Sequence, residues 1–212
     1  MHMQTFALLL AGAVALVGCL SDSAEEAPLS SKSQGLLGDW RLALADVEPD
    51  EFAFSYSFAR GGTFTNRIGG AFLKRIEELN EIEGIDIDTG RIDALDGGFL
   101  IFSGTWSEDG ESLDLVFDTL EIEVFGTVPL IGRLALPIHS EPLAGDNQLR
   151  YGCRVAGGRL TLDGQSLTLG IGASEIAGLD PLAVEVLRMV GDFALSQLSA
   201  SDADEYVMTR VD

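Results

Sequence analysis

Basic residues are scarce in this sequence. Its 212 residues include 13 Lys and Arg but 34 Asp and Glu, which gives a formal net charge of −21. A surface with this charge repels the phosphate backbone of DNA and RNA, so we expect no binding to nucleic acid. It also repels anionic lipids, so any attachment of the chain to a membrane must be hydrophobic or covalent.

Histidine is equally rare, which limits acid–base catalysis at neutral pH. The chain has two histidines, and only His139 lies outside the N-terminal segment. Ser140 and Glu141 follow it, but successive side chains on a strand point to opposite faces, so we expect no catalytic triad here. Because no nucleophile elbow, phosphate-binding loop or zinc-ligand spacing occurs either, we predict that the protein is not an enzyme and uses no cofactor.

The apolar run at the N-terminus is too short to cross a bilayer as a helix. It extends from Phe6 to Val17, the length of the hydrophobic region of a signal peptide. It ends in Leu16-Val17-Gly18-Cys19, and the polar stretch SDSAEEAPLSSKSQG follows almost at once. An ordinary buried N-terminal helix with an incidental cysteine is the alternative interpretation.

The end of this run resembles the lipobox of bacterial lipoproteins. The resemblance implies that residues 1–18 are a signal peptide, that Cys19 carries a diacylglyceryl group, and that residues 19–35 form a flexible tether. Acyl chains such as palmitate would anchor the protein permanently, because each buried methylene contributes about 0.8 kcal/mol. We therefore expect an exported, membrane-anchored protein of the cell envelope. Leu20 after the cysteine resembles the outer-membrane signal of Gram-negative lipoproteins. Cys153 would then be buried and unpaired, or joined to a second chain.

Alternating apolar residues predict antiparallel strands in much of the remaining chain. The segments 52–68, 98–126 and 204–212 show this period of two. The chain has 25 glycines, which supply the many tight turns that an all-β protein needs. Two similar sequences carry an Asp-Gly pair typical of hairpin turns, at Asp109-Gly110 and Asp163-Gly164.

Two segments break the strand rhythm and predict helices. Residues 70–83 place Phe72, Ile76 and Leu79 at helical spacing. Residues 181–198 follow Asp180, which can cap the helix N-terminus ahead of a proline in the first helical position. Hairpin-linked strands must close or pack, because open edges recruit other chains. We therefore predict a mainly all-β fold, an antiparallel up-and-down β-barrel with two inserted helices. A β-sandwich is the alternative.

Three short motifs resemble the lipocalin-like domains of bacterial lipoproteins. These are Gly38-Asp39-Trp40, the stretch FSYSFARGGTFT followed by GTWSEDGESLDL, and Thr209-Arg210 near the C-terminus. The resemblance implies a lipocalin-like barrel over residues 36–212. It also implies that Arg210 packs on the indole of Trp40 and closes one end of the barrel.

In function, the resemblance implies that the barrel binds or carries a small hydrophobic ligand. The residues expected to line its interior are Phe54, Phe58, Phe64, Phe102, Trp106, Leu115 and Phe117. These side chains could equally fill a solid core, because an eight-stranded barrel is just wide enough for either. The alternative function is therefore a non-enzymatic envelope scaffold or interaction module with a packed interior, whose protein partner the sequence does not identify.

One acidic stretch is a candidate for calcium binding. Asp86, Asp88 and Asp93 could supply the oxygen ligands that Ca²⁺ prefers. However, Gly90 stands where the third ligand of an EF-hand belongs, and the closing glutamate is absent. We therefore expect a solvated acidic loop and no metal site.

Overall fold

The structure is a computed structural model. It describes residues 30–42, 48, 51–89, 92, 94–143, 147–163, 179–198 and 205–211. The predicted signal peptide, Cys19 and most of the predicted tether lie outside the described residues. Within the described part of the chain, no helix is both long enough and apolar enough to cross a membrane.

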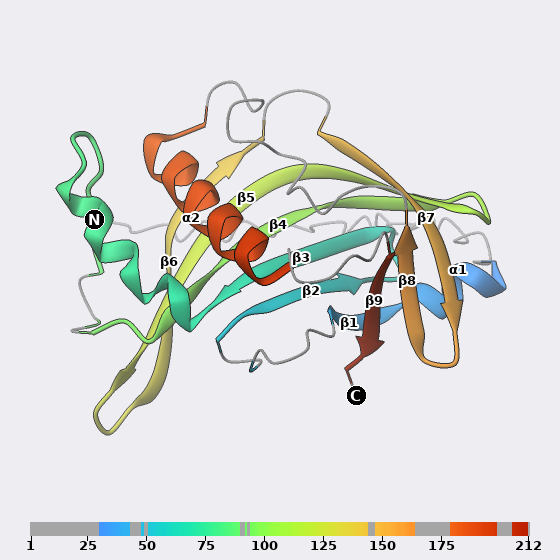
Figure 1. The fold of residues 1–212 in the computed structure, drawn as a ribbon, viewed down its shortest axis with the longest axis horizontal. Helices are drawn as coiled ribbons and strands as arrows, with labels where there is room; N and C mark the ends of the chain where they lie inside the picture. Colours follow the sequence, from blue (N-terminus) through green and yellow to red (C-terminus); the bar gives the residue numbers. More distant parts are fainter. Residues whose placement is uncertain are drawn as a thin grey trace, which may run out of the picture.

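The described residues form nine β-strands, two α-helices and one 3₁₀ helix (Figure 1). The strands are β1 (Gly38–Leu42), β2 (Ala53–Phe58), β3 (Thr63–Gly70), β4 (Gly97–Glu108), β5 (Ser112–Val128), β6 (Gly132–Pro142), β7 (Gln148–Ala156), β8 (Arg159–Asp163) and β9 (Glu205–Arg210). The helices are α1 (Ser31–Leu36), the 3₁₀ helix η1 (Ala71–Glu81) and α2 (Pro181–Leu198).

Eight of the strands close into a ring. Backbone pairing passes from β1 through β2, β3, β4, β5, β7, β8 and β9 and returns to β1, and every pair is antiparallel. Apart from β5–β7 and the closing pair β9–β1, each pair joins strands that are consecutive in the chain. The predicted antiparallel barrel-like fold is therefore confirmed, and the ring rules out the open two-sheet sandwich.

The strand β6 lies outside this ring. On one side of β5, β7 pairs with Ser112–Val116 and β6 pairs with Thr119–Val128. Because β5 is 17 residues long, it can hold both neighbours end to end. The β5–β6 hairpin consequently projects from the body of the barrel (Figure 1).

The core consists of the inward side chains of the strands and the apolar faces of the two longer helices. On β2, Phe54, Tyr56 and Phe58 are buried in alternation with more exposed neighbours, as the period-two pattern predicts. Helix α2 lies in front of the strands in Figure 1 and adds apolar residues to the core. These are Leu182, Ala183, Val186, Leu187 and Val190.

The segment predicted as a helix over 70–83 is a 3₁₀ helix rather than an α-helix. Its buried residues are Leu73, Ile76 and Leu79, which are three apart. This is the period of a 3₁₀ helix, in which side chains at i and i+3 lie in one line. Of the three residues predicted for the apolar side of this helix, Ile76 and Leu79 are buried and Phe72 is partly buried against the core.

The helix predicted after Asp180 begins where its capping residues indicate. In α2 the Oδ1 of Asp180 accepts a hydrogen bond from the backbone N–H of Leu182 at 2.9 Å. The N–H of Asp180 in turn donates to Glu141 on β6 at 3.4 Å. The capping residue therefore starts the helix and connects it to the outlying strand.

Ordered structure begins before residue 36. Helix α1 occupies the last residues of the predicted tether, and Ser30 accepts a hydrogen bond from the N–H of Ser33 at its start. The hydroxyl of Ser33 donates to Glu108 at 2.6 Å, and Leu36 is fully buried. The end of the tether is therefore fastened to the β4 end of the barrel, a contact that local composition does not reveal.

Candidate functional site

The barrel interior is the site that the sequence predicts for a hydrophobic ligand. All seven predicted lining residues face inward and are buried, and the most exposed of them, Trp106, shows 8% of its surface. The rings contact one another. Phe64 meets Phe117 edge to face at 5.1 Å between centroids, and Phe102 meets the same ring at 5.7 Å.

The predicted lining residues pack directly against one another. Phe58 packs edge to face on Trp106 at 5.6 Å, and the indole N–H of Trp106 donates to Ala59 O at 3.1 Å. The exposed fractions of the seven side chains are small, from zero for Leu115 to 8% for Trp106. The seven residues are thus brought together, but as neighbours in a packed aromatic cluster.

A small group of polar side chains lies within this apolar interior. Tyr56 and Tyr151 are hydrogen-bonded to each other, and burial raises the pKa of both hydroxyls, that of Tyr56 well above its usual value. Tyr206 is close enough to interact electrostatically with Tyr151. Asn66 is also buried and donates from Nδ2 to Ser55 O at 3.0 Å. All three tyrosines of the chain therefore face one region of the barrel.

One end of the barrel carries the predicted arginine–tryptophan pair. Trp40 on β1 is directly opposite Arg210 on β9, and the guanidinium lies 4.8 Å from the ring centroid. Arg210 also donates to the carbonyl oxygens of Gly35 at 2.9 Å and Leu37 at 2.7 Å. The indole N–H of Trp40 donates to Leu36 O at 2.7 Å. The pair thus holds the segment that enters β1 against the last strand.

Two cavities lined by described residues lie on the outer face of the sheet. The larger, of about 560 Å³, is lined by Arg41, Ala53, Ser55, Arg67, Gly70, Phe99, Glu123, Phe125, Arg133 and Ala135. The smaller, of about 400 Å³, shares Arg41, Ser55 and Arg67 with it. We call the two together the outer groove.

Strand register explains how the outer groove is assembled. Arg41 on β1 is opposite Ser55 on β2, and Ser55 is opposite Arg67 on β3. Phe99 on β4 is opposite Glu123 on β5. On each strand, the neighbours of these five residues point into the core. Because successive side chains of a strand point to opposite faces, all five side chains lie on the outer face.

Cationic and aromatic side chains are stacked in this groove. Arg67 lies 4.6 Å from the ring centroid of Phe99 and forms an ion pair with Glu123 at 2.8 Å. Arg133 lies 3.7 Å from the ring centroid of Phe125. Phe125 is buried although it stands outside the core cluster, so the groove itself covers it.

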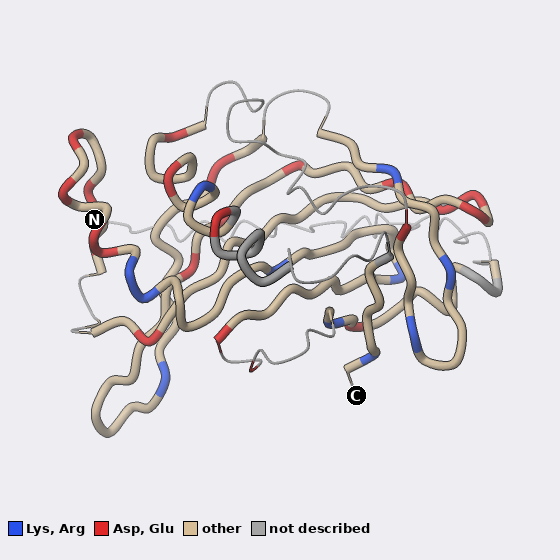
Figure 2. The backbone as a smooth tube through the Cα atoms, viewed as in Figure 1, with Lys and Arg blue, Asp and Glu red and all other residues tan. Residues whose placement is uncertain are grey.

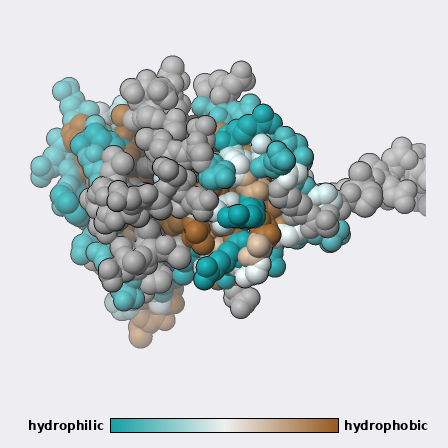
Figure 3. Space-filling model, turned by 45° about the vertical axis from the view of Figure 1, so that its right-hand side comes forward, coloured by the Kyte–Doolittle hydropathy of each residue, from teal (hydrophilic) through white to brown (hydrophobic). Residues whose placement is uncertain are grey.

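The tip of the β5–β6 hairpin is the most hydrophobic exposed part of the described chain. Leu130 is completely exposed and adopts a positive φ of 70°, and Ile131 is 74% exposed. No Asp or Glu occurs between Glu123 and Glu141. Figure 2 shows no acidic residue at this tip, and Figure 3 shows hydrophobic surface at the lower end of the molecule.

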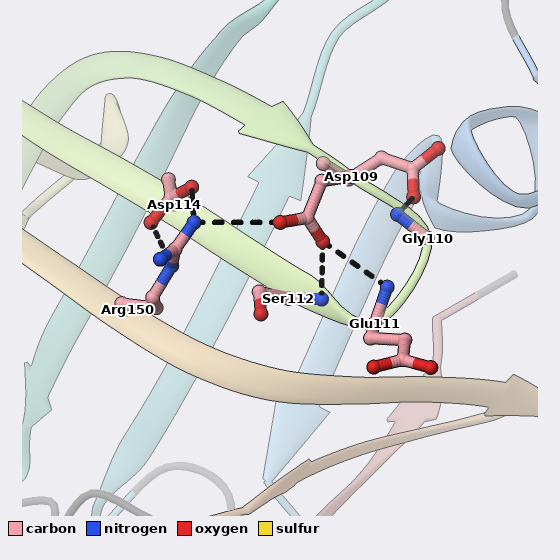
Figure 4. Close-up of polar contacts among 7 residues, drawn as sticks. Asp109, Gly110, Glu111, Ser112, Asp114 and Arg150 are labelled. Carbon is pink, nitrogen blue, oxygen red and sulfur yellow. Dashed lines mark hydrogen bonds and ion pairs between the residues drawn. The ribbon is translucent and has the colours of Figure 1, made fainter.

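The Asp109-Gly110 turn carries a polar cluster at the opposite end of β5 (Figure 4). Asp109 accepts hydrogen bonds from the backbone N–H groups of Ser112 at 2.9 Å and Glu111 at 3.2 Å. These bonds, more than the nearby Arg150, lower the pKa of Asp109. Arg150 pairs with Asp114 at 2.8 Å. Gly110 adopts the positive φ of 97° that this turn requires. The cluster fastens the β4–β5 hairpin to β7.

The second Asp-Gly pair behaves differently. Asp163 ends β8, and Gly164 lies outside the described residues. Strand β8 pairs with β7 on one side and with the C-terminal strand β9 on the other. The hairpin predicted at this pair therefore lies outside the described residues.

The remaining candidate residues do not converge. Asp86 and Asp88 are exposed, whereas the preceding residue in each case, Ile85 or Ile87, is buried. Asp93 lies outside the described residues. No group of three or more potential metal ligands occurs within the described residues.

His139 and Glu141 share one face of β6. Their Nε2 and Oε1 atoms are 3.1 Å apart, an ion pair only when the imidazole is protonated, and the geometry does not make a hydrogen bond. Ser140 is exposed on the other face. The three side chains therefore do not meet as a triad would require.

The outer groove is the feature that the sequence prediction missed. Arg41, Arg67 and Arg133 are 26 and 66 residues apart in the chain, and only strand register brings them to one cavity. The sequence pattern predicts that these arginines point outward from their strands. It does not predict which strands are neighbours. Comparison of the chain with protein-family models, curated proteins and solved structures found no match to any of them.

Proposed function

We propose that this protein is a lipid-anchored protein of the cell envelope that acts without catalysis as a scaffold or interaction module. The observation that carries the proposal is the position of its cavities. Aromatic side chains contact one another in the barrel interior, and two cavities lined by described residues lie on the outer face. A filled barrel is rigid, and a rigid barrel holds surface residues in place for contact with other molecules.

Membrane attachment is supported by two independent features. The lipobox-like sequence ends at Cys19, and the only strongly apolar exposed turn among the described residues is the β5–β6 tip with Leu130 and Ile131. The absence of acidic residues around this tip makes contact with a bilayer less costly there than elsewhere on a chain of charge −21. We propose the outer membrane as the location, on the basis of Leu20.

Palmitate labelling tests the anchor. Cells expressing the full chain are grown with radiolabelled palmitate, and the protein is followed through membrane fractionation. Cys19→Ser should lose the label and leave the membrane fraction, because it removes the thiol that is acylated. Cys153→Ala, which alters the other cysteine, should keep the label and remain in the membrane fraction. A Cys19→Ser protein that remains labelled and sediments with membranes would overturn the lipoprotein proposal.

A second candidate is the binding of a small hydrophobic ligand within the barrel. The polar group around Tyr56 and Tyr151 favours it, because ligand sites usually place a few polar groups in an apolar lining. For this function the packed rings would have to separate, with α2 and η1, which contact each other, moving aside.

Native mass spectrometry separates the two candidates. The full-length protein is purified from cells in a mild detergent and measured before and after denaturation. A single mass equal to the lipidated chain, with no uptake of a hydrophobic dye, is the result expected for a filled barrel. A reproducible additional mass that is lost on denaturation would instead favour the ligand carrier.

A further inference from the structure

We propose that the outer groove is a binding site for an organic dianion, a molecule with an aromatic or similarly flat body and a phosphomonoester or a pair of carboxylates. The proposal concerns the outer face of β1 to β6 and depends neither on lipidation nor on the contents of the barrel. It rests on the charge, the unpaired donors and the aromatic surfaces of the groove.

The charge of the groove is opposite to that of the molecule. Three arginines and one glutamate line the larger cavity, which gives a local charge of +2 in a chain of −21. Acidic residues outnumber basic ones 34 to 13, so carboxylate partners are abundant. Yet no ion pair joins Arg41 or Arg133 to a carboxylate within the part of the chain that the structure describes.

The third arginine is only partly satisfied by the protein. Arg67 pairs with Glu123 through Nη2, and 43% of its side chain is exposed. Its Nε is buried and has no hydrogen-bond partner among the described residues. An unpaired donor on a charged group costs free energy, and an anion that accepted from this guanidinium would recover it.

Two of the arginines are held by rings. The cation–π contacts with Phe99 and Phe125 hold the guanidinium groups of Arg67 and Arg133 close to the rings, within the groove. Because these groups are already held in place, little side-chain entropy is lost on binding. Phe99 is only partly buried, so it also offers apolar surface to the body of a ligand.

The size and charge of the groove identify the class of ligand. A volume of about 560 Å³ is within the usual range for small-molecule sites and much larger than an inorganic ion needs. The local charge of +2 matches a dianion. Ser55 and Thr65 add hydroxyls next to Arg67, which suit phosphate or carboxylate oxygens.

Calorimetric titration of the full-length protein in nonionic detergent tests the site. Phenyl phosphate and phthalate are the two dianionic probes, and benzyl alcohol is the uncharged aromatic control. We expect saturable binding of at least one dianion and none of benzyl alcohol. Binding of phenyl phosphate alone would assign a phosphomonoester, and binding of phthalate alone would assign a dicarboxylate.

Matched variants locate the binding. Arg133→Gln and Arg41→Gln should each weaken the dianion about tenfold, because each removes a charge-assisted hydrogen bond. Glu123→Gln should strengthen it, because the competing carboxylate on Arg67 is gone. Arg188→Gln, which removes the same charge from α2 outside the groove, should change nothing. Melting temperatures of all four variants verify that they are folded.

The proposal fails if neither dianion binds the wild-type protein. It fails equally if Arg133→Gln and Arg41→Gln bind as the Arg188→Gln control does, since the binding would then be a general charge effect. Neither failure affects the proposed envelope function, which palmitate labelling tests separately.

Discussion

At the scale of single residues, Arg210 joins the last strand to the chain that leads into β1. It lies over Trp40 and donates to two carbonyl oxygens of the chain that leads into β1. Gly35 lies in the last turn of α1 and Leu37 follows this helix, so the guanidinium bonds to carbonyls at the helix C-terminus as a cap would. The cation–π contact is therefore one part of a larger set of bonds.

Arg210→Gln should accordingly lower the free energy of unfolding by about 1–2 kcal/mol, through loss of the cation–π contact and the hydrogen bonds. Urea denaturation followed by tryptophan fluorescence measures the change. Arg154→Gln removes an exposed arginine from β7 and should have little effect. Equal stability of Arg210→Gln and the wild-type protein would mean that the pair does not secure this end of the barrel.

The Asp109 carboxylate gives a second prediction, about pH. Its pKa lies below the usual 3.8, first because of the backbone N–H of Ser112 and then of Glu111, with a smaller contribution from Arg150. Because the folded-state pKa is lowered, its stabilisation is present above pH 3.8 and is lost as the pH falls through the folded-state value.

Carboxyl ¹³C NMR titration should therefore give a midpoint for Asp109 below 3.8. Most of this depression should survive in Arg150→Gln, because the backbone donors remain. The stability difference between the wild-type protein and Asp109→Ala should shrink on acidification. A normal midpoint in the wild-type protein, or its full restoration by Arg150→Gln, would contradict the assigned order of causes.

At the scale of elements, β4 and β5 approach each other closely at a bulge. The register of the two strands shifts between Ser103 and Gly104. A Cβ atom added to Gly104 would lie 1.8 Å from the carbonyl oxygen of Val116, which is backbone and cannot move aside without breaking the ladder. Only glycine fits at this position.

We expect Gly104→Ala to destabilise the protein by about 2–3 kcal/mol, since it forces the two strands apart. Differential scanning calorimetry would measure the change. Gly61→Ala is the matched control, because a Cβ there meets nothing within 4 Å. Similar melting temperatures for Gly104→Ala and Gly61→Ala would show that the β4–β5 contact can relax.

In the 3₁₀ helix η1, the helical period decides which side chains are buried, and this can be tested by mutation. Leu73 is fully buried, whereas Phe72, which a 3.6-residue period places inward, is partly buried. Leu73→Ala should cost about 2–5 kcal/mol, as removal of a large core side chain does. Phe72→Ala should lower the free energy of unfolding by clearly less, as measured by urea denaturation. The reverse order would indicate that the segment is an α-helix in solution.

At the scale of the whole molecule, the charge of −21 acts against the compact state. Acidic residues lie on η1, on α2 and at several turns (Figure 2), so their mutual repulsion is distributed over the surface. Added salt screens this repulsion over a Debye length of about 10 Å at 0.1 M. Acidic residues are absent from the β5–β6 tip and from residues 147–162, which carry three arginines.

The melting temperature should therefore rise when sodium chloride is increased from low concentration to about 0.2 M. Calcium chloride at the same ionic strength should raise it by a similar amount, because Asp86 and Asp88 are exposed and do not converge with other ligands in the described residues. EDTA should have no effect. A much larger rise with calcium would restore the acidic stretch as a specific cation site.

By itself, the sequence determined the fold class, the hairpin at Asp109-Gly110 and the start of α2 at Asp180-Pro181. Each depends on local signals, namely alternation, turn residues and capping residues, which act within a few positions of the chain. The sequence also predicted a helix over residues 70–83 but did not identify it as a 3₁₀ helix, because α- and 3₁₀-helical spacings differ little over eleven residues.

Only the tertiary structure decided how the interior is filled and what the outer face carries. Whether Phe64, Phe102 and Phe117 leave a cavity depends on how rings from three strands interlock, which no local pattern encodes. Likewise, Arg41, Arg67 and Arg133 meet because β1, β3 and β6 contribute to one sheet in one register. Register couples residues that are distant in the chain, so the outer groove is a property of the closed sheet and not of any segment within it.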